Sequence, residues 1–260
     1  MIDEETLSVT SNYIEPYQKE KDYLEELFLA EIYGKFADQL VFKGGTAISK
    51  FYGSPRFSDD LDFSLSRRNR DPKRVDVLLN EVISKINKSY STRILRHSTD
   101  NRMTKYEFSV RGPLFEMLRH YQHLKVEINK DDEVAEDPNI INREPGYRDI
   151  QTYVAVVMTE AEILAEKVVV LLFRATPKAR DLYDLYYLLK KGNEIEVGLV
   201  DRKMHEHGHS FDEQQLNRRM ATMREIWNKE LKRLIPKKGF VSYEEASRTV
   251  MKGFKAANLF

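Results

Sequence analysis

The sequence predicts an α/β protein, in which a small mixed sheet with helices is followed by a mainly helical half. Three observations lead to this class. Short apolar or alternating runs, typical of strands, lie between Leu40 and Met158. Segments with apolar residues at helical spacing precede these runs and interrupt them. Beyond Thr159, the periodic segments have helical spacing. We therefore expect two domains, residues 1–150 and residues 151–260.

Composition narrows the class of protein further. The chain has 260 residues, of which 41% are hydrophobic and 32% charged, as in an ordinary globular protein. It has no cysteine, so disulfides and thiolate metal sites are excluded. No apolar run approaches the length of a membrane span, and the first residues lack the basic and apolar regions of a signal peptide. We expect a cytoplasmic protein without a membrane partner.

The charges are balanced in number but unevenly distributed. The 42 Lys and Arg match the 42 Asp and Glu, yet the segment from Arg202 to Phe260 holds thirteen basic residues against seven acidic ones. A basic tail beside an acidic half suits a polyanionic acceptor. A solvated helix face explains the same composition.

The first half opens with a helix and a short strand. Apolar residues recur at helical spacing from Glu15 to Asp38, which predicts an amphipathic helix that packs on the core. A short apolar β-type run follows from Leu40 to Phe42. Gly44 and Gly45 then let the backbone turn tightly, and Thr46 is placed to cap the next helix.

The segment from Asp60 to Leu65 alternates polar and apolar residues. Its three apolar side chains can enter a core, while Asp60 and Asp62 point together out of the opposite face. After it we expect a helix at Pro72–Lys88, β-type runs at Arg93–Leu95, Lys105–Val110, His123–Asn129 and Tyr153–Met158, and a long loop at Asp131–Asp149 that separates the halves. A basic run that can contact phosphates or RNA, or be a solvated charge run, comprises Arg67, Arg68, Arg70, Lys73 and Arg74.

The second half begins with a capping box at Thr159 to Glu162, which starts an apolar helix. Lys167 lies within this helix, and a buried ammonium group needs a partner. Snorkelling to the surface, or pairing with a neighbouring glutamate, is the alternative. In the following helix Asp181 and Asp184 are three residues apart and share a side. Favourable electrostatics at a helix start can account for both.

The chemistry that the sequence predicts is concentrated between Leu40 and Leu65. A glycine turn lets phosphates approach the backbone, and the first amides of the following helix favour an anion. Asp60 and Asp62 repel each other, which a divalent cation reverses, because Mg²⁺ is commonly held by one or two carboxylates and substrate phosphates. For an isolated Asp-x-Asp, a polar face at a sheet edge is the alternative.

Joined together, these patterns resemble a known family. Gly44-Gly45-Thr46, followed by Arg56-Phe57-Ser58-Asp59-Asp60-Leu61-Asp62, is similar to the first motif of the AbiEii/AbiGii toxin family of nucleotidyltransferases, within the DNA polymerase β-like superfamily. The Arg-x-Ser-x-Asp-x-Asp signature of that family matches at Arg56, Ser58, Asp60 and Asp62. Ala165-Glu166-Lys167 and the run from Arg180 to Leu185 resemble its later motifs. The resemblance covers Val41 to Leu189 in three patches.

The resemblance implies a nucleotidyltransferase-type fold with the nucleotide in a cleft between the halves. It implies that Asp60 and Asp62 bind two Mg²⁺ ions, that Lys167 holds the nucleotide's phosphates, and that Asp181 is the acid of the last motif, with Asp184 as a helper. Glu127 matches by order the strand that bears a third metal carboxylate, unless it is a plain surface glutamate. The implied nucleotide-binding residues are Gly44, Gly45, Thr46, Ser58 and Lys167.

The implied reaction moves a nucleoside monophosphate from an NTP to an acceptor hydroxyl, on RNA such as a tRNA 3′ end or on a protein. Such a protein is the toxin of a toxin–antitoxin or phage-defence pair, with an antitoxin encoded nearby. The alternatives are a non-catalytic module that binds nucleotide or nucleic acid, and a metal-dependent phosphoesterase, for which a histidine-rich ligand pattern is missing. We expect His205, His207 and His209 to lie in a solvated loop and Trp227 to lie in a core.

Overall fold

The computed structural model describes residue 2 and residues 4–67 and 74–259. The predicted helix start at Pro72, together with Arg68, Arg70 and Lys73 of the predicted basic run, lies outside the described residues. By its internal contacts the chain divides into two compact units. Unit 1 comprises Met1–Ala47 and Phe57–Met158, and unit 2 comprises Ile48–Arg56 and Thr159–Phe260. The predicted domain boundary at residue 150 stays a prediction.

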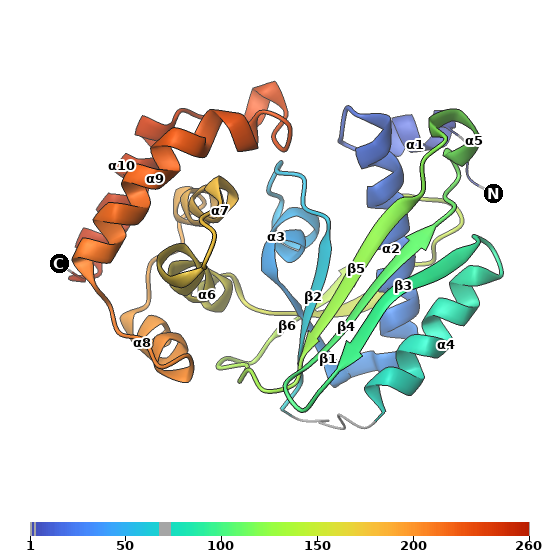
Figure 1. The fold of residues 1–260 in the computed structure, drawn as a ribbon, viewed down its shortest axis with the longest axis horizontal. Helices are drawn as coiled ribbons and strands as arrows, with labels where there is room; N and C mark the ends of the chain where they lie inside the picture. The colour runs from blue at the N-terminus through green and yellow to red at the C-terminus, as the bar shows by residue number, and fades with distance from the viewer. Residues whose placement is uncertain (1, 3, 68–73, 260) are drawn as a thin grey trace. The chain divides into compact units, whose positions relative to one another are not determined.

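Unit 1 contains the sheet, whose described strands number seven and follow the order β3-β4-β5-β2-β1-β7-β6 (Figure 1). The strands are β1 Leu40–Lys43, β2 Asp60–Leu65, β3 Thr92–Thr99, β4 Met103–Val110, β5 Gln122–Asn129, β6 Asn139–Arg143 and β7 Tyr153–Val157. β2 is antiparallel to β1 and parallel to β5, so the sheet is mixed, as predicted. The strand that carries Asp60 and Asp62 is therefore central, where neighbours on both sides hold its register.

The core of unit 1 lies between the sheet and the long helix α2 (Pro16–Phe36). The rings of Phe28 and Phe108 stack at 4.6 Å between centroids, and Tyr33 packs edge-on to Phe63 of β2. Helix α4 (Val75–Asn87) packs against α2 and β3 (Figure 1). The predicted helix before β1 is confirmed, although it ends at Phe36 and Ala37–Gln39 forms a separate 3-10 turn. Its predicted amphipathic character is wrong, because charged residues such as Glu20 and Glu25 are buried along with the apolar ones.

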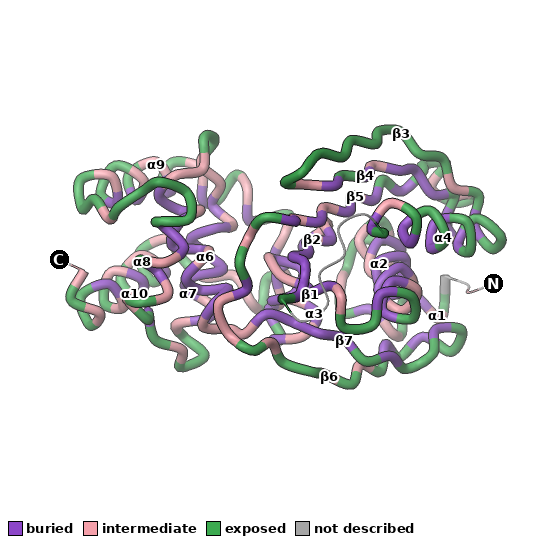
Figure 2. The backbone as a smooth tube through the Cα atoms, turned by 90° about the horizontal axis from the view of Figure 1, so that it is seen from below, coloured by how far each residue is buried: buried purple, intermediate pink, exposed green. Residues whose placement is uncertain are grey.

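The two edge strands are exposed, whereas the centre of the sheet is buried (Figure 2). β3 is exposed along nearly its whole length, and β6 has no fully buried residue. The prediction of one long loop from Asp131 to Asp149 is wrong in part, because β6 forms within it by antiparallel pairing with β7. This strand lacks the apolar alternation of a half-buried strand, so periodicity does not reveal it.

Unit 2 is helical, as predicted for the second half. Its complete helices are α6 Glu160–Phe173, α7 Ala179–Lys190, α8 Val197–Glu206, α9 Glu213–Leu231 and α10 Tyr243–Ala256. The side chain of Thr159 accepts a hydrogen bond from the amide of Glu162, which confirms the predicted N-terminal cap of α6. Trp227 is 1% exposed and donates to the carbonyl oxygen of Val241, which confirms its predicted place in a core.

The remaining described helices are short: α1 Glu4–Thr10, α3 Gly44–Tyr52 and α5 Phe115–Leu118. Helix α3 joins the two units along the chain, because its residues up to Ala47 belong to unit 1 and those from Ile48 to unit 2. Within the described ranges, no helix combines the length and apolar character that crossing a membrane requires.

Candidate active site

The turn from β1 into α3 brings the backbone against Asp62. Gly44 has φ +78°, a conformation that L side chains rarely adopt. A Cβ at this position would lie 2.8 Å from Asp62 Oδ2, which is closer than real Cβ contacts. Gly44 therefore leaves the space in front of one carboxylate free of any side chain. Gly45 follows within the first turn of α3.

Thr46 does not cap α3, contrary to the prediction, because the helix begins at Gly44 and Thr46 is its third residue. Its hydroxyl donates to the carbonyl oxygen of Asp60 at 2.6 Å and is hydrogen-bonded to Ser58 Oγ at 3.0 Å. Both side chains are buried. They tie the start of β2 to α3 and so hold the backbone that carries Asp60. Their contact with a nucleotide stays a prediction.

The alternation of β2 is confirmed. Leu61, Phe63 and Leu65 are buried, whereas Asp60 and Asp62 are only partly covered. The register continues this face across the sheet, because Asp62 lies opposite Lys43 of β1 and Glu127 of β5. The predicted third carboxylate is therefore next to Asp62, a placement that the order of the strands alone did not establish.

The lysines around this face are paired with acids other than the two aspartates. Lys43 Nζ lies 2.7 Å from Asp132 Oδ2, and Glu127 Oε1 lies 2.8 Å from Lys125 Nζ and 3.1 Å from Lys105 Nζ. Among the described residues, no ion pair or hydrogen bond reaches the carboxylate of Asp60 or Asp62. The two aspartates thus present adjacent negative charges without a direct cationic partner.

Electrostatics at Asp62 follow from this arrangement. Burial, together with the nearby charges of Asp60 and Glu127, raises the pKa of Asp62 to about 6. Burial also tends to raise the pKa of Glu127, but Lys125 and Lys105 outweigh it and the net pKa is lowered. Asp62 therefore carries its negative charge at an energetic cost, which a cation at this position would remove.

The donor set fits a hard divalent cation. Two carboxylates and the phosphates of a substrate are a common set of ligands for Mg²⁺. Among residues 4–67 and 74–259, no three or more His, Asp or Glu side chains form a group that could hold a metal ion by itself. The protein thus offers part of a coordination shell. Glu127, engaged by two lysines, stays a predicted third ligand.

The second predicted set of residues lies in unit 2, on α6 and α7. Lys167 Nζ is 2.8 Å from Asp184 Oδ2 and 3.6 Å from Asp181 Oδ1. Its side chain is 11% exposed, so it has the buried ion pair that the sequence required and does not snorkel. The partners are the two aspartates of α7, rather than a neighbouring glutamate.

Asp181 and Asp184 differ in how their charges are met. Asp181 is 1% exposed, and no described residue donates a hydrogen bond to its carboxylate oxygens. It has longer ion pairs, to Lys167 and, at 3.4 Å, to Arg174 Nε. Asp184 is fully buried, and it accepts from Arg56 Nε at 2.7 Å and from Arg56 Nη2 at 2.9 Å.

The sequence did not reveal that Arg56 pairs with Asp184. Arg56 belongs to the Arg-x-Ser-x-Asp-x-Asp signature, but nothing local indicates a partner 128 positions later. Burial tends to raise the pKa of Asp184, but the charges of Arg56 and Lys167 outweigh it and lower that pKa. Asp184 is therefore ionised, and it bridges an arginine and a lysine.

Replacing Asp184 with asparagine is expected to destabilise the protein by about 3–5 kcal/mol, because it leaves two buried cations without their shared carboxylate. The lowered pKa means that the native pairing stabilises the fold above the ordinary pKa of 3.8 and loses this effect as pH falls below it. The difference between wild type and variant should therefore shrink from pH 5 towards pH 2. Urea denaturation across this range measures it.

Asp201→Asn on α8 is the matched control, since that aspartate is exposed and the change in charge is the same. It should shift the free energy of unfolding by no more than about 0.5 kcal/mol. If Asp184→Asn were as mild as this control, the Arg56–Asp184–Lys167 network would contribute nothing to stability.

The basic segment from Arg202 holds no histidine-based metal site within the described residues. His205 lies in the last turn of α8 and not in a loop, contrary to the prediction, and His207 follows directly as its C-terminal cap. The ring of His209 stacks on Phe173 at 3.9 Å between centroids.

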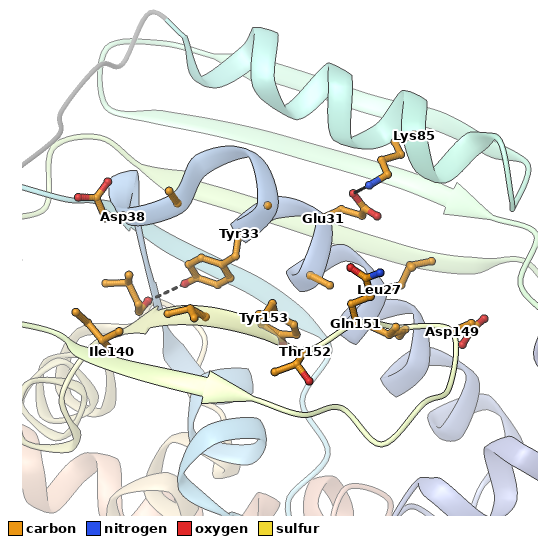
Figure 3. Close-up of a pocket in the computed structure, with 16 residues that line it drawn as sticks. Leu27, Glu31, Tyr33, Asp38, Lys85, Ile140, Asp149, Gln151, Thr152 and Tyr153 are labelled. Carbon is orange, nitrogen blue, oxygen red and sulfur yellow. Dashed lines mark hydrogen bonds and ion pairs between the residues drawn. The ribbon is translucent and has the colours of Figure 1, made fainter.

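A pocket of about 730 Å³ lies elsewhere in unit 1, between α2 and β7 (Figure 3). Tyr33 in its wall donates to the carbonyl oxygen of Val156 at 2.7 Å. Tyr33 also packs on Phe63, which is on the opposite face of β2 from Asp62. The residues that line this pocket include none of the predicted site residues. It is therefore distinct from the carboxylate face.

Comparison with known proteins identifies the family of the chain. Residues 27–246 match the family model described as "Nucleotidyl transferase AbiEii toxin, Type IV TA system". The structure resembles that of MenT4, a nucleotidyltransferase toxin from Mycobacterium tuberculosis, with 19% identity and a TM-score of 0.70, covering 100% of this chain and 91% of that one. It also resembles JHP933 from Helicobacter pylori, with 19% identity and a TM-score of 0.55. That match covers 95% of this chain and 94% of the JHP933 chain. No curated protein sequence gives a significant match.

The central Asp-x-Asp strand, the glycine turn against it and the family match together define the class: the protein is a nucleotidyltransferase. More particularly, the chain belongs to the AbiEii family of nucleotidyltransferase toxins of type IV toxin–antitoxin systems. The predicted family, fold class and enzyme class are thereby confirmed, whereas the similarity to the two solved structures shows a shared fold.

Proposed function

We propose that this protein is a Mg²⁺-dependent toxin that transfers a nucleoside monophosphate from an NTP to an acceptor hydroxyl, with pyrophosphate as the leaving group. The observation that carries the proposal is the pair Asp60 and Asp62, two adjacent carboxylates with which no described residue forms an ion pair. The repulsion between two adjacent carboxylates costs free energy, and such a cost is typical of functional sites, where a ligand compensates it. The acceptor is RNA, such as a tRNA 3′ end, or a protein.

In this proposal the roles of the residues follow from their chemistry. Asp60 and Asp62 hold two Mg²⁺ ions, with Glu127 as a third carboxylate. When bound, the ions neutralise phosphate charge and favour ionisation of the attacking hydroxyl. Gly44 and Gly45 let the triphosphate approach the backbone, and Thr46 and Ser58 support that turn. Lys167 neutralises charge on the phosphates, and Asp181, the acid of the last motif, lies beside Lys167.

The proposed chemistry accounts for features that folding alone does not require. Water offers a carboxylate better solvation than a crowded sheet face, so a central strand gains nothing from two unpaired aspartates. The positive φ of Gly44 likewise has a use if a phosphate oxygen approaches where a Cβ would otherwise stand. In a toxin–antitoxin pair, a separate antitoxin opposes the resulting activity.

The test is to incubate the purified protein with Mg²⁺, each α-labelled NTP in turn, and either total RNA or a protein extract. Label in a macromolecule, lost on adding a chelator, is the expected result. The fraction that carries the label identifies the acceptor. If all four nucleotides bind but none is transferred to either fraction, the protein is a non-catalytic binding module and the proposal fails.

Lys167→Met is expected to reduce transfer by about 10²-fold while the protein stays folded. The fold survives because Asp184 keeps Arg56 and Asp181 keeps Arg174 as partners. Steady-state transfer assays and thermal melts measure the two effects. Unchanged turnover in a folded variant would confine Lys167 to a structural role.

The matched control for Lys167→Met removes another buried ion pair of α6. Glu162 Oε1 lies 2.7 Å from Lys203 Nζ, and both side chains are almost fully buried. The double variant Glu162→Leu with Lys203→Met should alter stability but leave transfer within about twofold, because neither group takes part in the proposed reaction.

A further inference from the structure

The side chain of Arg56 is among the largest fully buried in the described protein, at 2% exposed. It belongs to unit 2, the unit that also contains α6 and α7. Its guanidinium donates two hydrogen bonds to Asp184, of 2.7 Å and 2.9 Å, one to each carboxylate oxygen. This bidentate geometry fixes the orientation of the carboxylate as well as its charge.

The same carboxylate holds Lys167. Asp184 Oδ2, which accepts from Arg56 Nη2, also lies 2.8 Å from Lys167 Nζ. The next acid, Asp181, is 3.6 Å from the ammonium group, too far for a hydrogen bond. Asp184 is therefore the close anchor of Lys167, and Arg56 sets where that anchor points.

The carboxylates of this cluster are shared. Arg56 and Lys167 both pair with Asp184, and Lys167 and Arg174 both lie near Asp181. Of the two cations that lower the pKa of Asp184, Arg56 has the larger effect. Without Arg56, the ammonium of Lys167 and the carboxylate would neutralise each other in a simple pair. With Arg56 present, the carboxylate of Asp184 is shared between two cations, and the ammonium group of Lys167 keeps N–H donors for a further acceptor.

We propose that Arg56 is a positioning residue for Lys167: acting through Asp184, it orients the ammonium group and keeps its charge available to the triphosphate of the substrate. This inference rests on the phosphate-binding role proposed for Lys167. It gives a function to the arginine of the Arg-x-Ser-x-Asp-x-Asp signature, which pairs with Asp184. A purely structural ion pair would instead affect stability alone.

Three variants separate the two roles. Arg56→Lys keeps a charge but loses the bidentate geometry, and Arg56→Gln loses both. The double variant Arg56→Met with Asp184→Leu removes the arginine and its carboxylate together, so one buried cation, Lys167, loses its close partner instead of two. This double variant keeps the test decisive if the single variants fold poorly. Glu162→Leu with Lys203→Met is the control, as an equally buried ion pair of the same unit.

The probe is inorganic tripolyphosphate, which carries the phosphate charges without a base or sugar. Isothermal titration to the 260-residue chain, with and without Mg²⁺, measures its affinity. KM for the NTP, separated from kcat, is measured in the transfer assay. We expect Arg56→Gln and the Arg56 and Asp184 double variant to lose about tenfold in tripolyphosphate affinity, with a matching rise in KM. Arg56→Lys should recover part of this loss, and the control should show none.

Each outcome decides the inference. Wild-type affinity in the folded Arg56 variants, with loss in Lys167→Met, would overturn the positioning role and leave the proposed function intact. Wild-type tripolyphosphate affinity in Lys167→Met would also overturn the positioning role, because Lys167 would then not contact the phosphates. If the wild-type chain binds tripolyphosphate through Lys167 and Arg56 but transfers no nucleotide, the proposed function fails while the positioning role stands.

Discussion

Asp62→Asn should abolish nucleotidyl transfer and, at the same time, stabilise the metal-free protein. Removing one of two metal-binding carboxylates is expected to lower kcat/KM by at least about 10³-fold, because charge that develops on the phosphates is no longer neutralised. The variant keeps the shape of the side chain, so the alternation of β2 and its buried face are retained. Label transfer to the acceptor measures the loss.

The stabilisation follows from the raised pKa of Asp62. The pKa of this carboxyl rises from 3.8 to about 6 on folding. Its ionisation therefore begins to destabilise the native state as the pH rises above 3.8, and the effect is complete once the pH is above about 6. A neutral amide removes this cost, by about 1 kcal/mol or more at pH 8, which corresponds to a shift in Tm of roughly 2–4 °C. At pH 4 the variant and the wild type should melt together. The melts are made with a chelator present.

Asp59→Asn is the control for this pair of effects, because it makes the same chemical change one residue before Asp60. It should retain transfer within a few-fold and show no comparable gain in Tm at pH 8. Full activity in Asp62→Asn would refute the metal-binding role of the Asp-x-Asp pair. Loss of activity combined with loss of stability would mean that Asp62 is structural.

Gly44→Ala should impair both folding stability and catalysis. An alanine at φ +78° costs about 1–3 kcal/mol in backbone strain. Its Cβ would also lie 2.8 Å from Asp62 Oδ2, so the carboxylate must move. A displacement of about 1 Å at a reacting centre can cost on the order of 10²-fold in rate. We therefore expect kcat/KM to fall by about that factor, with a lower Tm.

Gly192→Ala separates strain from steric effects. Gly192 also has a positive φ, +108°, but a Cβ there would meet nothing within 4 Å. That variant should lose stability to a similar or greater degree and keep its activity. If Gly44→Ala lost no more activity than Gly192→Ala, the turn would serve the backbone only, and the approach of phosphates to it would be refuted.

The periodic parts of the fold could be predicted because they depend on neighbours in sequence. Alternation over Asp60 to Leu65 places both aspartates on one face, whatever the sheet around them. Helical spacing likewise predicted α2 and the helices of unit 2, and Thr159 was recognisable as a cap from four adjacent residues. Where a segment lacked apolar periodicity, as in β6, the prediction failed.

The candidate site was determined by the sequence only in part. The local pattern predicted Asp60 and Asp62 as a metal-binding pair, and the family resemblance added Lys167 and Asp181, whose roles stay predictions. The sequence did not reveal that Thr46 binds the backbone of Asp60, since capping and tertiary hydrogen bonds use the same hydroxyl. The place of Glu127 beside Asp62 required the parallel register of β2 and β5.

Only the tertiary structure decided the partners of the buried charges. Local sequence indicated that Lys167 needed a carboxylate, but the nearest glutamates in the chain were the expected choice. Packing instead selected Asp184, 17 positions away, and then joined it to Arg56, 128 positions away. The physical reason is that a buried charge is satisfied by whichever group the folded chain brings within about 3 Å with the right geometry, and no pattern of neighbouring residues encodes that distance.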